Sequence, residues 1–527
     1  MPPKKRSRKK VSVLDRARGL ASLDMVNGGA VLDHTQRDAI RQSTAALTAE
    51  LTRVDAEARR LHALRRELVS QLRINDALLV PIRMLPHDVL SEIFREVVSR
   101  YRAASRNLGT PAIARVCREW RATALGDPRL WTVINVPYHC NWDESAKAAI
   151  EAFLSRSRHL PLHVRARGRM RDPELLGGWG SDEDESENFD EGPSHLDIFA
   201  LRAIEHIAVL SAHRWKSLSL SGHRNIFDQQ KQLELPILDS ITIAVRTSFN
   251  AGRDPLTFAF LAHAPRLRKM ILDARYACFH LPRWKTLKHA TYLLYECSWD
   301  EYTSMGFELY AQEGLETLAV LEQDNCGSCD IFSRRGHRFS SDISLPHLIS
   351  STISGLGHFI LCSILAPKLQ RLVAQDGYQD GDVEEDPGVL SSILCMDTKC
   401  SLQSLRVLEL VRVILDEDVG MNIVYQCLDR LSTLESLHIE SNRNFSDERT
   451  ILRYELLVWL TRTAEAPARL PNLTKLSLYF GKDRHKGAKS RLRNLLASRE
   501  SDGSAEGVSL SALTRFRTDI SKELQIG

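Results

Sequence analysis

Residues 405–410 read LRVLEL, and the same spacing of apolar side chains returns in LESLHI at 434–439 and in LTKLSL at 473–478. Each copy follows the pattern apolar-x-x-apolar-x-apolar, whose second half alternates as in a β-strand with one buried face. Ten copies occur, and the intervals between their first residues run from 20 to 39. Those first residues are Trp215, Leu238, Leu267, Leu287, Leu315, Leu348, Leu369, Leu405, Leu434 and Leu473. Residues 136–483 are therefore predicted to form a repeat array.

A unit with one strand cannot bury its apolar face alone, so such units must stack on one another. Stacking predicts a curved parallel sheet with helical segments outside it. The pattern is typical of leucine-rich repeats, although the regular Asn of that family is mostly missing and the spacing varies. We expect an irregular leucine-rich-repeat-like α/β solenoid, with a non-repeat α/β sandwich as the alternative. Disordered acidic loops near 180–193 and 376–388 would interrupt it, and 484–527 would form a C-terminal cap or tail.

Upstream of the array, residues 81–135 carry two short amphipathic segments with a surplus of apolar side chains. The stretch PIRMLPHDVLSEIFREVVSR at 81–100 predicts a helix with Pro86 in its first turn. A second helix is predicted from Thr110 to Gly126, and Asp127 with Pro128 would form a turn after it. Helices this short cannot bury such faces on each other alone, so the segment has the character of an interaction surface.

LPHDVLSEIF at 85–94, followed by VCREWRATALGDPRLW at 116–131, resembles an F-box over about Pro81 to Ile134. It is similar in particular to the F-box proteins of mushroom-forming fungi, in which a predicted coiled coil precedes the motif. The departure from the family lies between Phe94 and Val116, where the usual spacer is missing. The resemblance implies a small all-α module that binds the Skp linker subunit of a Skp–cullin–F-box (SCF) ubiquitin ligase. The residues that it implies for this contact and the core beside it are Leu85, Pro86, Val89, Leu90, Ile93, Phe94, Val116, Cys117, Trp120, Leu130 and Trp131.

Taken together, these features predict a non-catalytic adaptor. The F-box would dock on the Skp subunit, and through it on a cullin ligase, while the array presents an unidentified target protein for ubiquitination. One alternative is that the apolar residues of 81–135 only pack against the downstream domain. The chain would then be a non-ligase scaffold or a chromatin-associated protein-interaction module that uses its coiled coil and repeats.

A heptad pattern precedes this module in residues 33–80, where apolar side chains recur at alternating intervals of four and three. The seam consists of Ile40, Thr44, Leu47, Leu51, Val54, Ala58, Leu61, Arg65, Leu68, Leu72, Asn75 and Leu79. A long coiled-coil helix is expected, ended by Pro81. The seam either pairs with a second copy or lies against the rest of this chain, and we favour self-association.

The charge of the chain is concentrated at its beginning. Of 71 Lys plus Arg and 67 Asp plus Glu, six basic residues between Lys4 and Lys10 contribute +6, so the rest carries −2. Such a body is a poor polyanion binder, and a nucleic-acid partner is not expected. Residues 1–32 are predicted to be a disordered basic tail, acting as a nuclear-import signal, a weak nucleic-acid arm or a merely solvated segment.

Neither a membrane partner nor enzymatic chemistry is expected. No run of 18 apolar residues and no apolar N-terminal segment occurs, which predicts a cytoplasmic or nuclear protein. Cys326 and Cys329 form a lone C-x-x-C with His337 nearby, too few ligands for structural zinc, so we expect free thiols. A metal or reactive thiol at this pair would instead indicate a hydrolase or redox enzyme. With no P-loop and no G-x-S-x-G, no catalytic residue, metal or cofactor is predicted.

Overall fold

The computed structural model describes residues 12–104, 112–136, 143–167, 195–224, 227, 232–246, 256–274, 279–294, 309, 312–322, 342–375, 388–397, 402–413, 420–441, 450–463, 469–480, 488–505 and 508–520. The basic cluster Lys4–Lys10, the acidic segments apart from Gly388, and the pair Cys326 and Cys329 lie outside these residues. The chain falls into two units, Met1–Ile93 and Phe94–Gly527, and the division lies within helix α4 (His87–Ala104).

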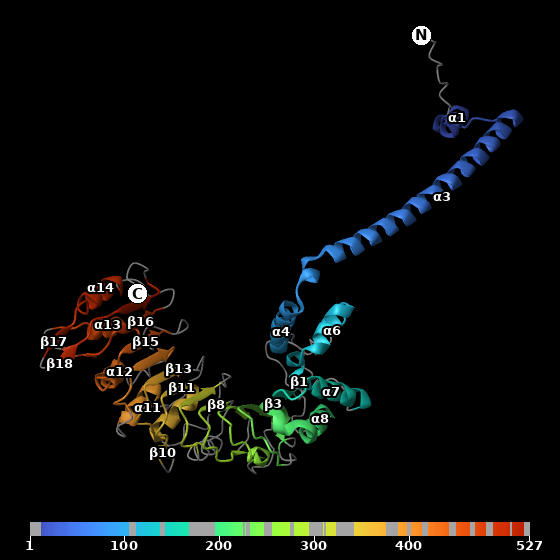
Figure 1. Ribbon diagram of the computed structural model, residues 1–527. Coiled ribbons are helices and arrows are strands. Elements are labelled where there is room, and N and C mark those ends of the chain that lie inside the picture. Colours follow the sequence, from blue (N-terminus) through green and yellow to red (C-terminus); the bar gives the residue numbers. More distant parts are fainter. Residues whose placement is uncertain are drawn as a thin grey trace, which may run out of the picture. The chain divides into compact units, whose positions relative to one another are not determined.

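The first unit begins with two short capped helices. α1 (Val13–Leu20) follows Ser12, whose hydroxyl accepts a hydrogen bond from the Asp15 amide at 3.0 Å, and Ser22 caps α2 (Leu23–Asn27) in the same way. α1 packs against α3 (His34–Leu79), near the N-terminal end of that helix (Figure 1). The expectation of a disordered tail over 1–32 is therefore wrong from residue 12 onward, because side-chain caps stabilise both short helices.

One uninterrupted helix of 46 residues, α3, makes up about half of this unit. It begins with a capping box, in which the Asp33 carboxylate accepts from the Gln36 amide at 2.7 Å and the Gln36 side chain accepts from the Asp33 amide at 3.1 Å. It ends before η1 (Pro81–Met84), since proline cannot continue a helix. The long helix predicted over 33–80 is confirmed, and pairing along its seam stays a prediction.

The second unit begins with the rest of α4 and with α6 (Arg118–Gly126). The prediction of one second helix from Thr110 to Gly126 is wrong, because residues 114–116 form a turn and Cys117 has extended backbone angles. The Cys117 thiol caps α6 by accepting a hydrogen bond from the Trp120 amide at 3.4 Å. Thr110 itself lies outside the described residues. Asp127 then caps η2 (Pro128–Trp131), as the predicted turn requires.

Thirteen strands form one parallel sheet in which each strand lies beside the next one of the set along the chain. All ten predicted repeats supply a strand, and their ten first residues are fully buried. The strands are β1 (Val133–Val136), β2 (Leu162–Arg167), β3 (Trp215–His223), β4 (Ser240–Arg246), β6 (Lys269–Ala274), β8 (His289–Leu294), β9 (Thr317–Glu322), β11 (Ser350–Ser354), β13 (Arg371–Gln375), β14 (Val407–Val411), β15 (Ser436–Glu440), β16 (Lys475–Tyr479) and β19 (Arg515–Thr518). This solenoid-like parallel sheet is the fold that the repeats predicted.

The register of the strands aligns the apolar positions of successive repeats. Leu408 of β14 pairs with Leu437 of β15, which pairs with Leu476 of β16, and all three side chains are fully buried. The residues between them on each strand face the other side of the sheet and remain partly exposed. Each repeat therefore buries its apolar face on its two neighbours, as stacking requires.

Helices and short strands line the outer side of the sheet in this unit (Figure 1). The helices are α7 (Glu144–Arg156), α8 (His195–Ser211), η4 (Ala212–Arg214), η5 (Ala259–Leu261), η6 (Gly355–Ser363), α11 (Gly388–Asp397), α12 (Gly420–Asp429), α13 (Tyr454–Leu460) and α14 (Ala488–Ala497). The short strands are β5 (Leu256–Thr257) with β7 (Phe279–His280), β10 (Ile343–Ser344) with β12 (Ile364–Leu365), and β17 (Gly503–Ala505) with β18 (Val508–Leu510).

The array extends beyond the predicted 136–483 at both ends. Residues 131–136 read WTVINV, which is one more copy of the repeat pattern, and its strand β1 pairs with β2, so the sheet begins within the predicted 81–135 module. At the other end, β19 pairs with β16 and Phe516 is fully buried. The array therefore runs to Thr518, and much of 484–527 belongs to it.

Candidate protein-interaction surfaces

The apolar stripe of α4 divides into a buried and an exposed row. Leu90, Phe94 and Val98 follow one another at intervals of four residues and are 2%, 1% and 3% exposed. Val89, one position before Leu90, is 40% exposed, and Ile93 is half-buried. A spacing of four keeps residues on one side of a helix, so the first row is core and the second row is available to a partner.

The Leu-Pro pair of the predicted F-box lies between two helices of the first unit. Leu85 ends η1, where its amide donates to the Ile82 carbonyl, and it is half-buried. Pro86 is exposed, and its carbonyl accepts the Leu90 amide at 3.0 Å as α4 begins. The pair therefore sets where α4 begins and leaves the pyrrolidine ring of Pro86 exposed.

In the second unit, Trp120 of α6 lies against Phe94, with ring centroids 4.9 Å apart. Trp120 is half-buried, and so is Cys117, whose thiol is free of any disulfide and caps the helix. Val116 is 59% exposed. Over residues 116–120, the Trp120 ring is packed, the Cys117 thiol caps the helix, and the Val116 side chain is exposed.

Leu130 and Trp131 belong to the core of the second unit, each only 1% exposed. The Trp131 indole donates to the Ala124 carbonyl of α6 at 2.8 Å. Its ring packs edge-on against the ring of Phe153 in α7, with the two centroids 4.8 Å apart. The Arg156 guanidinium lies 4.4 Å from the same ring. Trp131 therefore holds α6 and α7 together, in the place that Trp215 occupies in its own repeat.

The eleven residues implied by the F-box resemblance thus differ in accessibility. Leu90, Phe94, Leu130 and Trp131 are buried, Leu85, Ile93, Cys117 and Trp120 are half-buried, and Pro86, Val89 and Val116 are exposed. The structure brings Phe94 to Trp120, and it joins Trp131 to α6 through Ala124. Of these eleven residues, only the exposed and half-buried ones can contact a partner directly.

The open face of the sheet is mixed in charge. Opposite charges pair between neighbouring strands or just beside them, as in Arg371 with Glu409 at 2.9 Å and Arg412 with Glu440 at 3.3 Å. Lys288 and Glu316 meet at 2.6 Å, and this hydrogen bond lowers the pKa of Glu316. A surface of neutralised pairs suits a protein partner better than a polyanion.

A polar groove of about 690 Å³ runs along the N-terminal ends of the last strands. Its wall includes the residue that directly follows the first leucine in successive repeats, namely Ile349, Gln370, Arg406, Glu435 and Thr474. Arg406 and Glu435 form an ion pair across it at 3.1 Å. Sequence reasoning missed this groove, although the second position of each repeat pattern identifies it.

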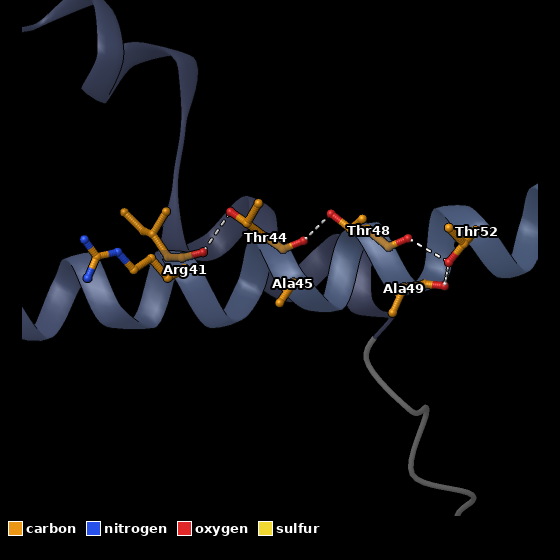
Figure 2. A pocket seen from close by; sticks show the side chains of 7 residues that line it. Arg41, Thr44, Ala45, Thr48, Ala49 and Thr52 are labelled. Carbon is orange, nitrogen blue, oxygen red and sulfur yellow. Dashed lines mark hydrogen bonds between the residues drawn. The ribbon is translucent and has the colours of Figure 1, made fainter.

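A second depression, of about 630 Å³, lies along α3 in the first unit (Figure 2). Its polar side chains include Thr44, Thr48 and Thr52, whose hydroxyls each donate to the backbone carbonyl four residues earlier, at 2.9, 2.9 and 3.0 Å. These hydroxyls are already hydrogen-bonded within the helix, so the depression has the character of a groove for a neighbouring helix and not of a small-molecule site.

Within the described residues, no group of three or more His, Cys, Asp or Glu side chains is arranged to hold a metal ion. Cys326, Cys329 and His337 lie outside those residues, so their expected lack of metal stays a prediction. No helix in the described part of the chain is long and apolar enough to span a membrane.

Comparisons with known proteins name no family. No family model matches the chain, and no curated protein matches it. Among solved structures, a chain in the crystal structure of a TLR13–ssRNA13 complex aligns with 14% identity and a TM-score of 0.33. The alignment covers 68% of this chain and 42% of that chain, so the present chain spans less than half the length of the chain that it matches.

Proposed function

We propose that this protein is a substrate-recognition adaptor of an SCF-type ubiquitin ligase. Its F-box-like segment, 81–135, would bind the Skp linker subunit, and its leucine-rich-repeat-like array would hold a target protein. Catalysis would be positional, because tethering raises the effective concentration of target lysines near the conjugating enzyme. No residue of this chain would perform chemistry.

One observation carries this proposal: the four sequence elements LP, L-x-x-I-F, V-C-R-x-W-R and P-x-L-W occur in order directly before a thirteen-stranded sheet. The exposed Pro86, Val89 and Val116 supply apolar contacts of the kind that a protein interface buries. The open face and the polar groove of the sheet would offer the target-binding surfaces, since repeat arrays bind their partners on extended surfaces of this kind.

The alternative is a scaffold that uses the same array without a ligase, in which 81–135 only completes the core. The burial of Leu90, Phe94, Leu130 and Trp131 favours a structural role for those four residues. Both functions need those residues to be buried, so only the exposed and half-buried members of the motif distinguish the two.

The test is co-purification of the full chain with the Skp subunit of its host. Two variants should lose binding while remaining folded: the double variant Leu85→Ala with Pro86→Ala, and Val89→Arg, which places a charge on the exposed row of α4. A central apolar contact at an interface is worth roughly 2 kcal/mol, so binding should weaken about thirtyfold. Circular dichroism reports whether each variant keeps its helix and sheet content.

The matched control is Val209→Arg, the same change at an 86% exposed position of α8 in the second unit. It should leave Skp binding unchanged. A folded wild-type chain that fails to capture Skp would refute the adaptor proposal and leave the scaffold function.

A further inference from the structure

The long helix α3 exposes its seam. None of its residues is buried, and Leu51, Leu61, Leu68 and Leu72 are 56–61% exposed. Ile40 and Leu47 are half-buried, at the end of the helix where α1 packs. Apolar side chains repeated along 46 residues are a surface that another helix covers. The polar residues of the seam indicate which helix covers it.

A second copy in parallel orientation fits poorly. In a parallel pair each seam residue meets its own counterpart, so Arg65 would face Arg65 of the other copy within the apolar layer. Glu50 and Asp55 occupy the flanking positions that face each other across a parallel pair, which adds two carboxylate repulsions. Both effects oppose this arrangement.

A second copy in antiparallel orientation fits well. With the two helices fully overlapped, the first and fourth positions of the heptads oppose each other, and every exception in the seam finds a matching residue. Small Ala58 meets Leu61, polar Thr44 meets Asn75, and the guanidinium of Arg65, opposite Val54, reaches Glu57 of the other copy. The remaining layers join Leu51 to Leu68, Leu47 to Leu72, and Ile40 to Leu79.

The flanking positions support the same orientation. Antiparallel pairing places Arg41 opposite Asp76 and Asp55 opposite His62, so a guanidinium meets a carboxylate in the first pair and an imidazole meets a carboxylate in the second. In the single chain, Arg41 makes an exposed ion pair with Asp38 at 3.2 Å, which is weak enough to rearrange.

The apolar face of α3 is broader in its C-terminal half than in its N-terminal half. The C-terminal half adds Leu64, Val69 and Leu78 to the seam, all exposed, whereas the N-terminal half is flanked by α1. In an antiparallel pair the broader half of one copy would lie beside both α3 and α1 of the other. The exposed Leu14 and Leu20 of α1 would then gain a partner.

We infer that the protein forms an antiparallel homodimer through α3, with Leu51 of one copy packed on Leu68 of the other. This dimer is independent of the proposed ligase function, since it uses neither the 81–135 segment nor the repeat array. A dimer would present two arrays to a target and so raise the avidity of binding.

The test combines mass with site-specific cross-linking of the full chain. Light scattering should give a mass near twice 59.6 kDa at micromolar concentration. Residues 1–93 contain no cysteine, so Leu51→Cys, Leu68→Cys and the variant carrying both changes can be oxidised and mapped by peptide mass spectrometry. The double variant should give a disulfide between residues 51 and 68 of two copies. Each single variant should give none within α3, because identical positions lie about 26 Å apart along an antiparallel pair.

Three results would overturn the inference. A monomeric mass for the wild-type chain would exclude the dimer. Efficient disulfides from either single variant would show parallel pairing, and a dimeric double variant without the 51–68 disulfide would exclude this register. Circular dichroism checks that each variant keeps the helical signal of the wild type, and Leu→Cys keeps an apolar side chain at each position.

Discussion

Arg499 is a charged side chain inside the last part of the array. It is fully buried, and its guanidinium donates to the carbonyls of Leu460 at 3.0 Å, Leu470 at 3.2 Å and Arg469 at 2.9 Å. Burial, with the nearby positive charge of Arg462, lowers the pKa of Arg499 to about 9, so it stays protonated at neutral pH. A single buried cation thereby satisfies three carbonyls at the end of α13 and in the loop before β16.

Replacing this cation should be strongly destabilising. Arg499→Met keeps the length of the side chain but removes the three hydrogen bonds that the carbonyls of Leu460, Arg469 and Leu470 accept from it, which should cost about 3 kcal/mol. Thermal unfolding followed by circular dichroism measures the loss, and Arg493→Met, at an exposed position of α14, is the control. Equal melting temperatures for the two variants would contradict the role assigned to Arg499.

Trp131 allows a second prediction at the same scale. Trp131→Ala removes a buried ring that contacts Phe153 and Arg156, so it should cost about 3–5 kcal/mol and lower the melting temperature. Trp131→Phe keeps most of the ring and loses the hydrogen bond to Ala124, so its cost should be about 1–2 kcal/mol. Any loss of Skp binding in Trp131→Ala should therefore accompany unfolding, unlike the loss in Val89→Arg. If Trp131→Ala stays folded and still fails to bind Skp, then Trp131 belongs to the Skp interface.

At the scale of single elements, the charges along α3 should decide how the helix pairs. Arg41→Glu alone, or Asp76→Arg alone, would place like charges opposite each other twice in the antiparallel dimer, weakening it about tenfold. The double variant restores opposite charges and should recover most of the affinity. Sedimentation equilibrium of the full chain measures the dissociation constant.

The control for this exchange is Arg59→Glu, the same charge reversal on the outer side of α3. It should leave the dissociation constant unchanged within a factor of about two. Failure of the double variant to recover affinity would contradict the pairing of Arg41 with Asp76.

At the scale of the whole molecule, the C-terminal repeat should stabilise the array as a cap. A chain that ends at residue 483 loses α14 and β19, which exposes the edge of β16 and uncovers its buried Leu476 and Leu478. Exposed strand edges with apolar neighbours promote aggregation, so this truncation should lower solubility and the melting temperature. A chain that ends at Ile520 is the control and should resemble the wild type. A soluble truncation at 483 with unchanged melting would restore the view of 484–527 as a tail.

The long helix, the ten strands of the repeat copies and β2, whose segment LPLHV at 160–164 predicts a strand, could be predicted because their signals are local. A period of 3.5 residues without Gly or Pro specifies α3, and each leucine pattern specifies both the strand and its buried side. The last strand escaped prediction because Thr518, which is buried, stands where the pattern has an apolar residue. The first strand escaped because WTVINV overlaps the F-box-like motif, so Trp131 was assigned to that module alone.

Tertiary structure decided what periodicity leaves open. The apolar stripe of α4 does not show that Leu90 and Phe94 are core while Val89 is exposed, because burial depends on the elements packed around the helix. The break before α6 depends on Cys117 acting as a cap, a role that its residue type does not favour. The groove of Gln370, Arg406 and Glu435 exists only once separate repeats are stacked. The sequence by itself therefore determined which segments become strands and helices, since that depends on neighbours along the chain. Which side chains are left for a partner was decided by contacts between segments far apart in sequence.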